Sequence, residues 1–154
     1  MSRVCTIDVG STRMKAALRD SNGITIARSE IDFPGFSENL EMLKYEELWQ
    51  ATLFLISDAV KEKSFEKLII SCQMAGFSAI DSDGNPVAPL ISGVDSRAPL
   101  RNRPDLTRSG IPMGGPSTYA IFNWLKESNE KLRKRDVRIG GIKEYLIFRM
   151  TGKW

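Results

Sequence analysis

The apolar run KLIISC at residues 67–72 is the segment that most constrains the fold. A continuous run of this kind is typical of a strand buried on both faces. Before it comes a segment in which apolar residues recur at helical spacing: Leu48, Trp49, Thr52, Leu55, Ile56, Ala59 and Val60. A helix followed by a buried strand indicates a parallel crossover that returns beside an earlier strand.

The N-terminal part of the chain predicts three strands in an antiparallel meander. Residues 3–9 form a short apolar run that stops at Gly10, and residues 13–20 alternate apolar and polar side chains. The turn residues SNG at 21–23 lead into a third strand at 23–31. The crossover strand at 67–72 is therefore expected to lie beside the first strand.

The later part of the chain predicts shorter elements. They are a hairpin around the turn SDGN at 82–85, a proline-rich loop at 92–116, a helix at 117–132, a strand at 136–140 and a helix at 142–150 that Gly152 caps. Together these elements define an α/β fold with a mixed five-stranded sheet and helices on both faces.

Composition narrows the range of functions. The chain has 154 residues, 42% of them hydrophobic, which suffices for one domain with a core. Its net charge of +3 comes from scattered residues, so nucleic-acid binding is not expected. No apolar stretch reaches the ~20 residues of a membrane span and no signal peptide is evident, so we expect a cytoplasmic protein.

Histidine is absent from the sequence, and cysteine occurs only twice. A Ser-His-Asp triad, a Cys-His pair and an imidazole metal site are therefore excluded. Cys5 and Cys72 each lie in an apolar run that predicts a strand, where a thiol usually behaves as a small hydrophobic group.

A strand end followed by a turn of small residues is the most informative motif for function. Asp8 ends the first strand, and Gly10, Ser11 and Thr12 follow with two hydroxyls and outward-pointing backbone N–H groups. Such a turn can receive phosphate oxygens, Lys15 adds a positive charge, and Asp8 can face a hydrated Mg²⁺. The alternative is that Asp8 only accepts hydrogen bonds from an ordinary hairpin turn.

The position of this motif in a strand-turn-strand resembles the first phosphate loop of the actin, sugar kinase and chaperone ATPase superfamily. Within it, the chain is similar to the FGGY carbohydrate kinases over nearly its whole length. Three further blocks carry this resemblance. The family's Ser-Gly-Gln-Met-His-Gly strand end and the hairpin after it resemble SCQMAGFSAIDSDGNPVAPLI at 71–91. The family's Trp-x-Asp-x-Arg loop resembles SGVDSRA at 92–98, and its Lys-Asp-Tyr-Leu helix ending in Thr-Gly resembles IKEYLIFRMTGKW at 142–154.

The resemblance implies a ribonuclease-H-like (actin-like ATPase) domain over residues 1–154, with an inserted hairpin and loop at about 77–116. It implies a kinase that transfers the γ-phosphoryl group of ATP to a carbohydrate hydroxyl, with ATP and Mg²⁺ as cofactors. The family's catalytic base and second phosphate loop belong to sequence that would follow Trp154, in a missing C-terminal domain. We therefore expect this chain to be inactive alone.

The resemblance also implies roles for individual residues. Asp8, Gly10, Ser11, Thr12 and Lys15 would hold the ATP phosphates, with Asp8 at the metal. Gln73, Met74, Asp95 and Arg97 would line the site for a sugar or polyol, whose hydroxyls need paired donors and acceptors. As an alternative, Asp95 and Arg97 form an ion pair that stabilises their loop.

Some positions depart from the family pattern, and other functions stay open. Ala75 stands where many relatives have His, and Gly93 and Val94 replace a polar residue and an aromatic one.

The competing hypothesis is a stand-alone ligand-binding or regulatory module with the same fold. The Gln-Met block and the Thr-Gly helix argue against an actin-type or chaperone-type ATPase. We also expect association into homo-oligomers, because a lone domain would expose the apolar walls of its cleft.

Overall fold

A computed structural model describes residues 2–34, 44–95, 97–98 and 117–154. The described residues fall into two compact units, one formed by residues up to Gln73 and the other by residues from Met74 onward. Each unit has its own sheet, so each is treated separately below.

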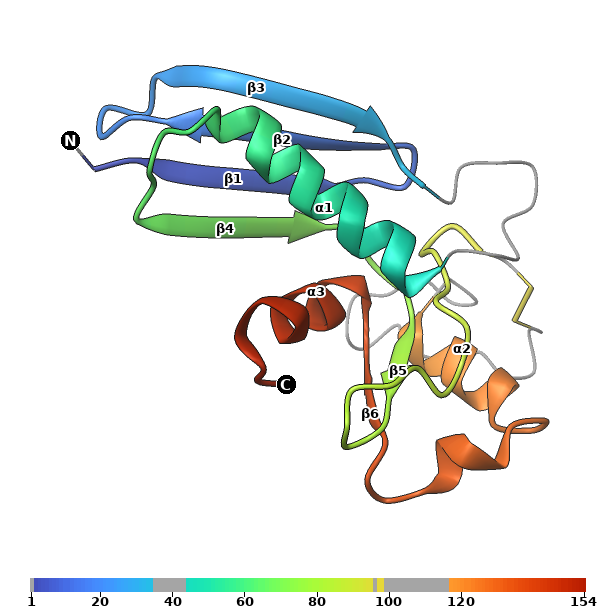
Figure 1. Ribbon diagram of the computed structural model, residues 1–154. Coiled ribbons are helices and arrows are strands. Elements are labelled where there is room, and N and C mark those ends of the chain that lie inside the picture. The colour runs from blue at the N-terminus through green and yellow to red at the C-terminus, as the bar shows by residue number, and fades with distance from the viewer. Residues whose placement is uncertain (1, 35–43, 96, 99–116) are drawn as a thin grey trace. The chain divides into compact units, whose positions relative to one another are not determined.

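The described residues of the first unit form a four-stranded mixed sheet with one helix on it. Its elements are β1 (Val4–Val9), β2 (Arg13–Arg19), β3 (Thr25–Asp32), α1 (Tyr45–Val60) and β4 (Lys67–Cys72). The strand order is β3-β2-β1-β4, with β1 antiparallel to β2 and parallel to β4 (Figure 1). The meander and the parallel crossover expected from the sequence are both confirmed.

Helix α1 covers one face of this sheet, where it contacts β1, β2 and β3. Its buried face carries Leu48, Thr52, Leu55 and Ala59. Alternate residues of β1 and β2 are buried, among them Ile7 and Leu18, while their neighbours along the chain are exposed or half-buried. This period of two is what a sheet covered on one face requires. The prediction that residues 67–72 are buried on both faces is wrong, because β4 lies at the edge of the described sheet and its residues are exposed or half-buried.

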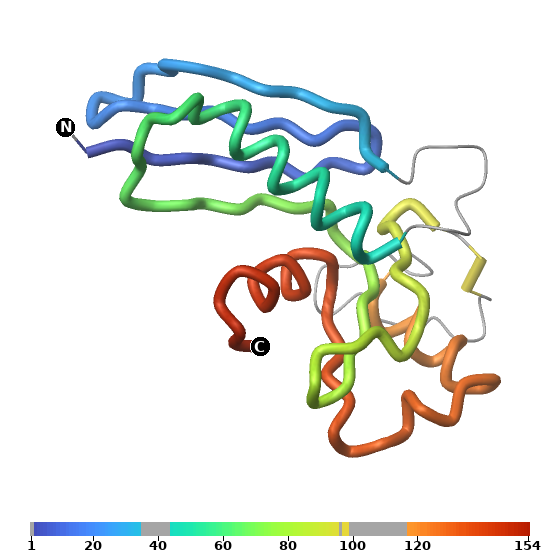
Figure 2. Tube along the Cα trace, viewed as in Figure 1, coloured from blue at the N-terminus to red at the C-terminus, as the bar shows by residue number. Residues whose placement is uncertain are grey.

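The helix ends because its C-cap residue leaves the helical region of the backbone. Lys61 has φ 45°, a left-handed conformation, and its N–H donates to the carbonyl of Ser57. The chain then turns back, and β4 begins at Lys67 on the other side of β1 from β2 (Figure 2). The helix therefore lies over the sheet that its flanking strands build.

The described residues of the second unit form a two-stranded sheet and three short helices. Its elements are β5 (Ser78–Ile80), α2 (Thr118–Leu125), the 3₁₀ helix η4 (Glu130–Arg133), β6 (Arg138–Gly140) and α3 (Ile142–Thr151). Its buried cluster contains Phe77, Ala79, Ile91, Ala98, Ala120, Ile121 and Leu132. The last helix and its cap at Gly152, with φ 69°, agree with the sequence prediction.

Two further details of the predicted architecture are wrong. The strand expected at 136–140 as the fifth of the main sheet is β6, which pairs antiparallel with β5, and the described part of the main sheet has four strands. The Ser78 hydroxyl donates to the carbonyls of Gly140 and Gly141, which helps to hold β6 there. The prediction was wrong because a three-residue strand carries no signal for its partner.

The helix expected at 117–132 is also interrupted. It ends at Leu125, and the Arg133 side chain donates to the carbonyl of Lys126 just beyond that end. The side-chain amide of Asn129 donates to the carbonyl of Val87, and its oxygen accepts from the Lys131 N–H at the start of η4. The contacts at the Lys126 carbonyl and the Lys131 N–H satisfy backbone groups that a continuous helix would have paired internally. Most of the loop expected at 92–116 lies outside the described residues.

In the described ranges, no helix is long and apolar enough to span a membrane.

We predict that Leu55→Ala destabilises the protein far more than Leu53→Ala on the same helix. Leu55 is fully buried against the sheet, whereas Leu53 is 40% exposed. The first change should lower the free energy of unfolding by about 2–5 kcal/mol and the second by less than about 1 kcal/mol. Urea unfolding followed by circular dichroism measures both, and equal losses would contradict the placement of α1.

Candidate functional site

The turn between β1 and β2 has the backbone geometry of a tight hairpin loop. Gly10 N–H donates to the carbonyl of Arg13 at 3.0 Å, and Phe33 N–H donates to the carbonyl of Thr12 at 2.8 Å. A Cβ added at Gly10 would lie 2.7 Å from the Arg13 carbonyl oxygen. The turn therefore requires glycine at this position, and the hydroxyls of Ser11 and Thr12 follow directly at the end of the sheet.

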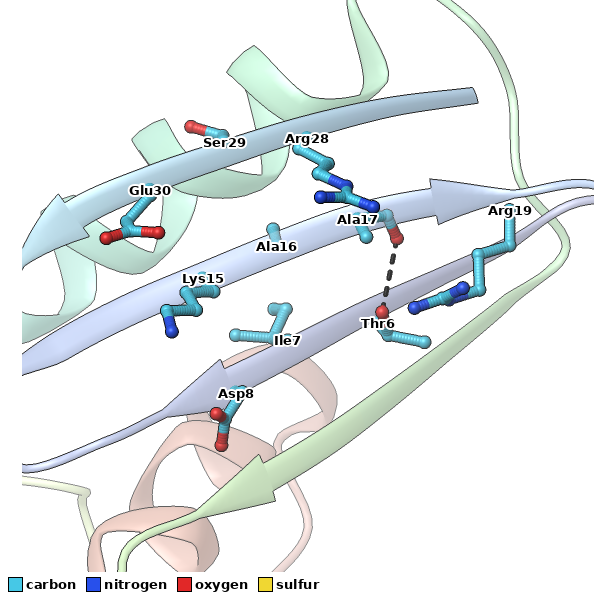
Figure 3. Close-up of a pocket in the computed structure, with 10 residues that line it drawn as sticks. All are labelled: Thr6, Ile7, Asp8, Lys15, Ala16, Ala17, Arg19, Arg28, Ser29 and Glu30. Carbon is cyan, nitrogen blue, oxygen red and sulfur yellow. Dashed lines mark hydrogen bonds between the residues drawn. The ribbon is translucent and has the colours of Figure 1, made fainter. Parts of the chain in front are cut away.

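Asp8 and Lys15 face each other across the β1–β2 pair, on the sheet face away from α1. Both side chains line a groove of about 540 Å³, and Figure 3 shows them on neighbouring strands. They form no ion pair within 4 Å with any described residue. The sequence alternative, in which Asp8 accepts hydrogen bonds from the turn, gains no support, because no such bond is seen in this part of the chain.

Further along the groove lie Arg19, Arg28 and Glu30, which complete its charged rim. Arg19 donates to the carbonyl of Gly23, and Glu30 is paired with Arg13. The hydroxyl of Thr6 donates to the carbonyl of Ala17 at 3.3 Å, and Figure 3 draws this bond. Of the charged groups that line the groove, Asp8 and Lys15 lie nearest the turn in the chain.

Gln73 follows β4 and meets the same turn. Its backbone N–H donates to the carbonyl of Val9 at 2.8 Å, and its side-chain Nε2 donates to the carbonyl of Gly10 at 3.5 Å. This proximity follows from the parallel pairing of β1 with β4, which brings the carboxyl ends of both strands to one edge. The first unit therefore brings together Asp8, Gly10, Ser11, Thr12, Lys15 and Gln73.

The second unit holds the other predicted residues, beginning with Met74 and Ala75. The Met74 side chain is 88% exposed, which is unusual for a large apolar residue. Ala75 has φ 63°, a left-handed conformation that a non-glycine residue seldom adopts. No sequence pattern predicts this turn, because alanine is not a residue that favours positive φ.

Asp95 and Arg97 form a close ion pair in the second unit. Arg97 Nη2 lies 2.6 Å from Asp95 Oδ2, Nε lies 3.1 and 3.0 Å from the two carboxylate oxygens, and the Arg97 N–H donates to Oδ1 at 2.9 Å. The Asp95 side chain is 2% exposed and that of Arg97 is 37% exposed. The ion pair foreseen as the structural alternative is therefore present.

The environment of Asp95 changes the acidity of its carboxyl group. Burial alone would raise the pKa of Asp95, but hydrogen bonds and the positive charge of Arg97 outweigh it and lower that pKa below its usual value. Asp95 is thus ionised in the folded protein at neutral pH, and its main observed partner is a guanidinium group whose own side chain stays partly exposed.

Trp124 is a residue of this site that sequence reasoning missed. Its ring lies under Arg97, with Cζ 5.7 Å from the ring centroid, in a cation–π arrangement. The sequence indicated only that Trp124 belongs to a helix, and no spacing links it to a loop so far away in the chain. Arg97 is therefore held from two sides, by Asp95 and by Trp124.

The fold and the turn define a class of protein with an actin-like ATPase domain. The chain belongs to the FGGY family of carbohydrate kinases, whose N-terminal domain it matches over residues 4–154. The resemblance stated from the sequence, and the fold class that it implied, are confirmed.

Individual relatives agree with this assignment. Gluconokinase of Bacillus subtilis is 24% identical over 96% of this chain and 32% of its own length. The xylulose kinase structure from Lactobacillus acidophilus is 23% identical, with a TM-score of 0.78 over 99% of this chain and 34% of that protein. Plasmodium falciparum glycerol kinase, solved with ADP, is 17% identical with a TM-score of 0.73 over 99% of this chain and 35% of its own. The chain spans about a third of the length of these relatives.

We predict that Arg97→Met destabilises the protein in a pH-dependent way, because it leaves the Asp95 carboxylate buried without its guanidinium. At neutral pH the loss should be about 2–3 kcal/mol, below the range for a fully buried pair because Arg97 is partly exposed. The pKa of Asp95 is lowered by folding, so the pair stabilises the native state above the unfolded pKa and this contribution is lost as the pH falls through the folded pKa.

The difference between the wild type and Arg97→Met should therefore shrink towards acid pH, where the variant can protonate Asp95. Urea unfolding at about pH 7 and about pH 3 measures it. Lys143→Met is the matched control, because it removes the exposed ion pair with Glu144 in the same unit and should cost less than about 1 kcal/mol. A loss independent of pH would contradict the prediction.

Proposed function

We propose that this chain is the N-terminal domain of an ATP-dependent kinase that phosphorylates a hydroxyl group of a sugar or polyol. The observation that carries the proposal is the glycine-dependent turn at Gly10 at the carboxyl end of β1. Beside it lie Asp8 and Lys15, which form no ion pair with the residues that the structure describes. Family membership supports the same reaction, since the relatives named above are gluconate, xylulose and glycerol kinases.

The turn would hold the phosphates of the nucleotide. Backbone N–H groups and the hydroxyls of Ser11 and Thr12 offer donors to phosphate oxygens, and Lys15 adds a positive charge. Glycerol kinase, a relative by fold, was solved with ADP, which supports a nucleotide as the ligand. In this role the chain's residues bind and orient the phosphates, while the attacking hydroxyl comes from the sugar.

Asp8 would face the Mg²⁺ that accompanies the nucleotide. The described residues contain no group of three or more acidic, cysteine or histidine side chains that could enclose a metal. A single exposed carboxylate fits Mg²⁺, which keeps several waters and is held by one or two carboxylates together with the phosphates. When bound, the ion neutralises charge that develops on the transferred phosphoryl group.

Met74, Asp95 and Arg97 would contribute to the sugar site. The guanidinium of Arg97 is positioned by Asp95 and Trp124 and stays partly exposed, so it can donate to sugar hydroxyls. Asp95 is buried and already engaged, so its role would be to orient Arg97. The exposed Met74 side chain offers apolar surface to the C–H groups of a sugar ring.

A kinase of this kind would act in the cytoplasm, where ATP is available.

The test uses the product of the complete open reading frame that contains residues 1–154. We expect ADP release from MgATP only in the presence of one sugar from a panel of gluconate, D-xylulose, L-xylulose and glycerol. The separate 154-residue chain should release none, because the remaining two thirds of the relatives' length have no counterpart in it. Sugar-dependent turnover by the 154-residue chain would contradict the proposal that it holds only part of the active site. Absence of turnover by the product of the complete reading frame with all of these sugars would contradict the proposed kinase activity.

Asp8→Asn should lower kcat of the active protein about 100-fold or more, because it removes the carboxylate proposed for the metal. Asp58→Asn is the matched control, since Asp58 lies on the exposed side of α1 in the same unit. A steady-state assay of ADP release measures both variants. Equal activities of the two would show that Asp8 has no part in the reaction.

A further inference from the structure

Strand β3 (Thr25–Asp32) lies at an edge of the described sheet of the first unit. It pairs with β2 on one side, and on its other side it pairs with no strand of the part of the chain that the structure describes (Figure 1). An edge strand presents a row of backbone N–H and C=O groups on which a further strand can pair. The side chains and backbone of β3 therefore decide which strand it can accept.

The hydrogen bonds to β2 determine which backbone groups of β3 point outward. Phe33 N–H, just beyond β3, donates to the carbonyl of Thr12 at 2.8 Å, and the two strands pair without a register shift along residues 27–32. Hydrogen-bonded and non-hydrogen-bonded pairs alternate along antiparallel strands. The odd-numbered residues in this range therefore bond to β2, and the backbone groups of Arg28 and Glu30 point away from it.

The side chains of β3 divide by charge between the two faces of the sheet. Arg28 and Glu30 are exposed on the face away from α1, where both line the groove shown in Figure 3. Glu30 is paired with Arg13, whereas Arg28 forms no ion pair with a described residue. Ala27 and Ile31 are half-buried on the opposite face, since successive side chains of a strand alternate.

We propose that the outer edge of β3 binds a second copy of this chain, with the two β3 strands antiparallel about a twofold axis at Ser29. In this arrangement Arg28 of each copy lies directly opposite Glu30 of the other, and Ala27 lies opposite Ile31. Because the contact is twofold, each of these pairs occurs twice. The sheets of the two copies would then join edge to edge.

Hydrogen bonding and charge select this register over its neighbours. A shift by one residue would set outward-pointing backbone groups against residues whose groups already bond to β2. A shift by two residues would set Arg28 opposite Arg28 in one direction, or Glu30 opposite Glu30 in the other. Like charges directly opposite each other destabilise a strand pair, whereas opposite charges stabilise it. The charges of β3 are thus complementary to those of a second β3.

This contact does not depend on the proposed kinase activity. It uses only the first unit and the outer edge of one strand. The homo-oligomers expected from the sequence would then form through a strand edge and two pairs of charges, not through exposed apolar surface.

The first experiment measures self-association of the 154-residue chain by sedimentation velocity at a series of concentrations. We expect the wild type to form a concentration-dependent dimer. Arg28→Glu should raise the Kd of this dimer about 10-fold or more, because it sets two acidic side chains opposite each other at two places. Glu30→Arg should do the same with two basic side chains. An equimolar mixture of the two variants should dimerise about as tightly as the wild type, because every changed charge then faces an opposite one.

Lys63→Glu is the matched control for this experiment. Lys63 is exposed in the turn between α1 and β4, and the substitution changes the net charge as much as Arg28→Glu does. It should leave the Kd of the dimer unchanged. A wild type that stays monomeric at every concentration would overturn the inference. So would a mixture of Arg28→Glu and Glu30→Arg that dimerises no better than either variant alone.

The second experiment tests the register by disulfide formation in the product of the complete reading frame. Arg28→Cys is made in this protein, and Glu30→Cys is made in a copy that carries a size tag. Opposite Cα atoms of antiparallel strands lie about 4.5–5.5 Å apart, which suits a disulfide. Oxidation of the mixture should give a disulfide dimer of mixed size, as seen on a non-reducing gel.

The controls for this second experiment are the wild type and each cysteine variant alone. The wild type reports any disulfide formed by the protein's own cysteines, among them Cys5 and Cys72. Neither variant alone should form more disulfide dimer than the wild type. A mixture without the mixed dimer would overturn the inference, and so would Arg28→Cys alone giving as much dimer as the mixture.

Discussion

The parallel pairing of β1 with β4 is the constraint on which the site depends. Its register sets Asp8 beside Ser71 and Val9 beside Cys72, so both strands end at one edge of the sheet. Only a crossover can join parallel neighbours, and α1 supplies it with a face that packs on the strands. The buried hydroxyl of Thr52 in that face is satisfied by the carbonyl of Leu48 within the helix. Without this pairing, Gln73 would not meet the turn at Gly10.

The sequence predicted the first unit well because its signals are local. Alternation along β1 and β2, helical spacing in α1 and the turn at Asn22 and Gly23 are each readable over a few residues. The second unit was predicted less well, since β6 is three residues long and the partner of so short a strand is decided by contacts such as those of Ser78. The early end of α2 likewise depends on Arg133, which acts from the following 3₁₀ helix.

In the candidate site too, some features could be predicted from the sequence and others could not. The need for glycine at position 10 and the closeness of Asp8 and Lys15 follow from a hairpin that the sequence predicts. The direction of the Gln73 side chain does not, because the residue follows the end of a strand and its amide can turn either way. The ion pair between Asp95 and Arg97 was foreseen as one of two alternatives, and Trp124 was not foreseen at all, since a cation–π contact leaves no pattern in the spacing of residues.

The hydrogen bond between Gln73 and Gly10 joins a side-chain donor to a main-chain acceptor. Its acceptor is a main-chain carbonyl, which every amino acid would supply, whereas its donor is a side-chain amide that a single codon change removes. Position 10 is in addition closed to side chains by the Arg13 carbonyl. Substitution at position 73 is therefore the direct way in which this contact can be lost. In a lineage of such proteins, the residue at that position shows whether a side-chain donor to the turn was kept.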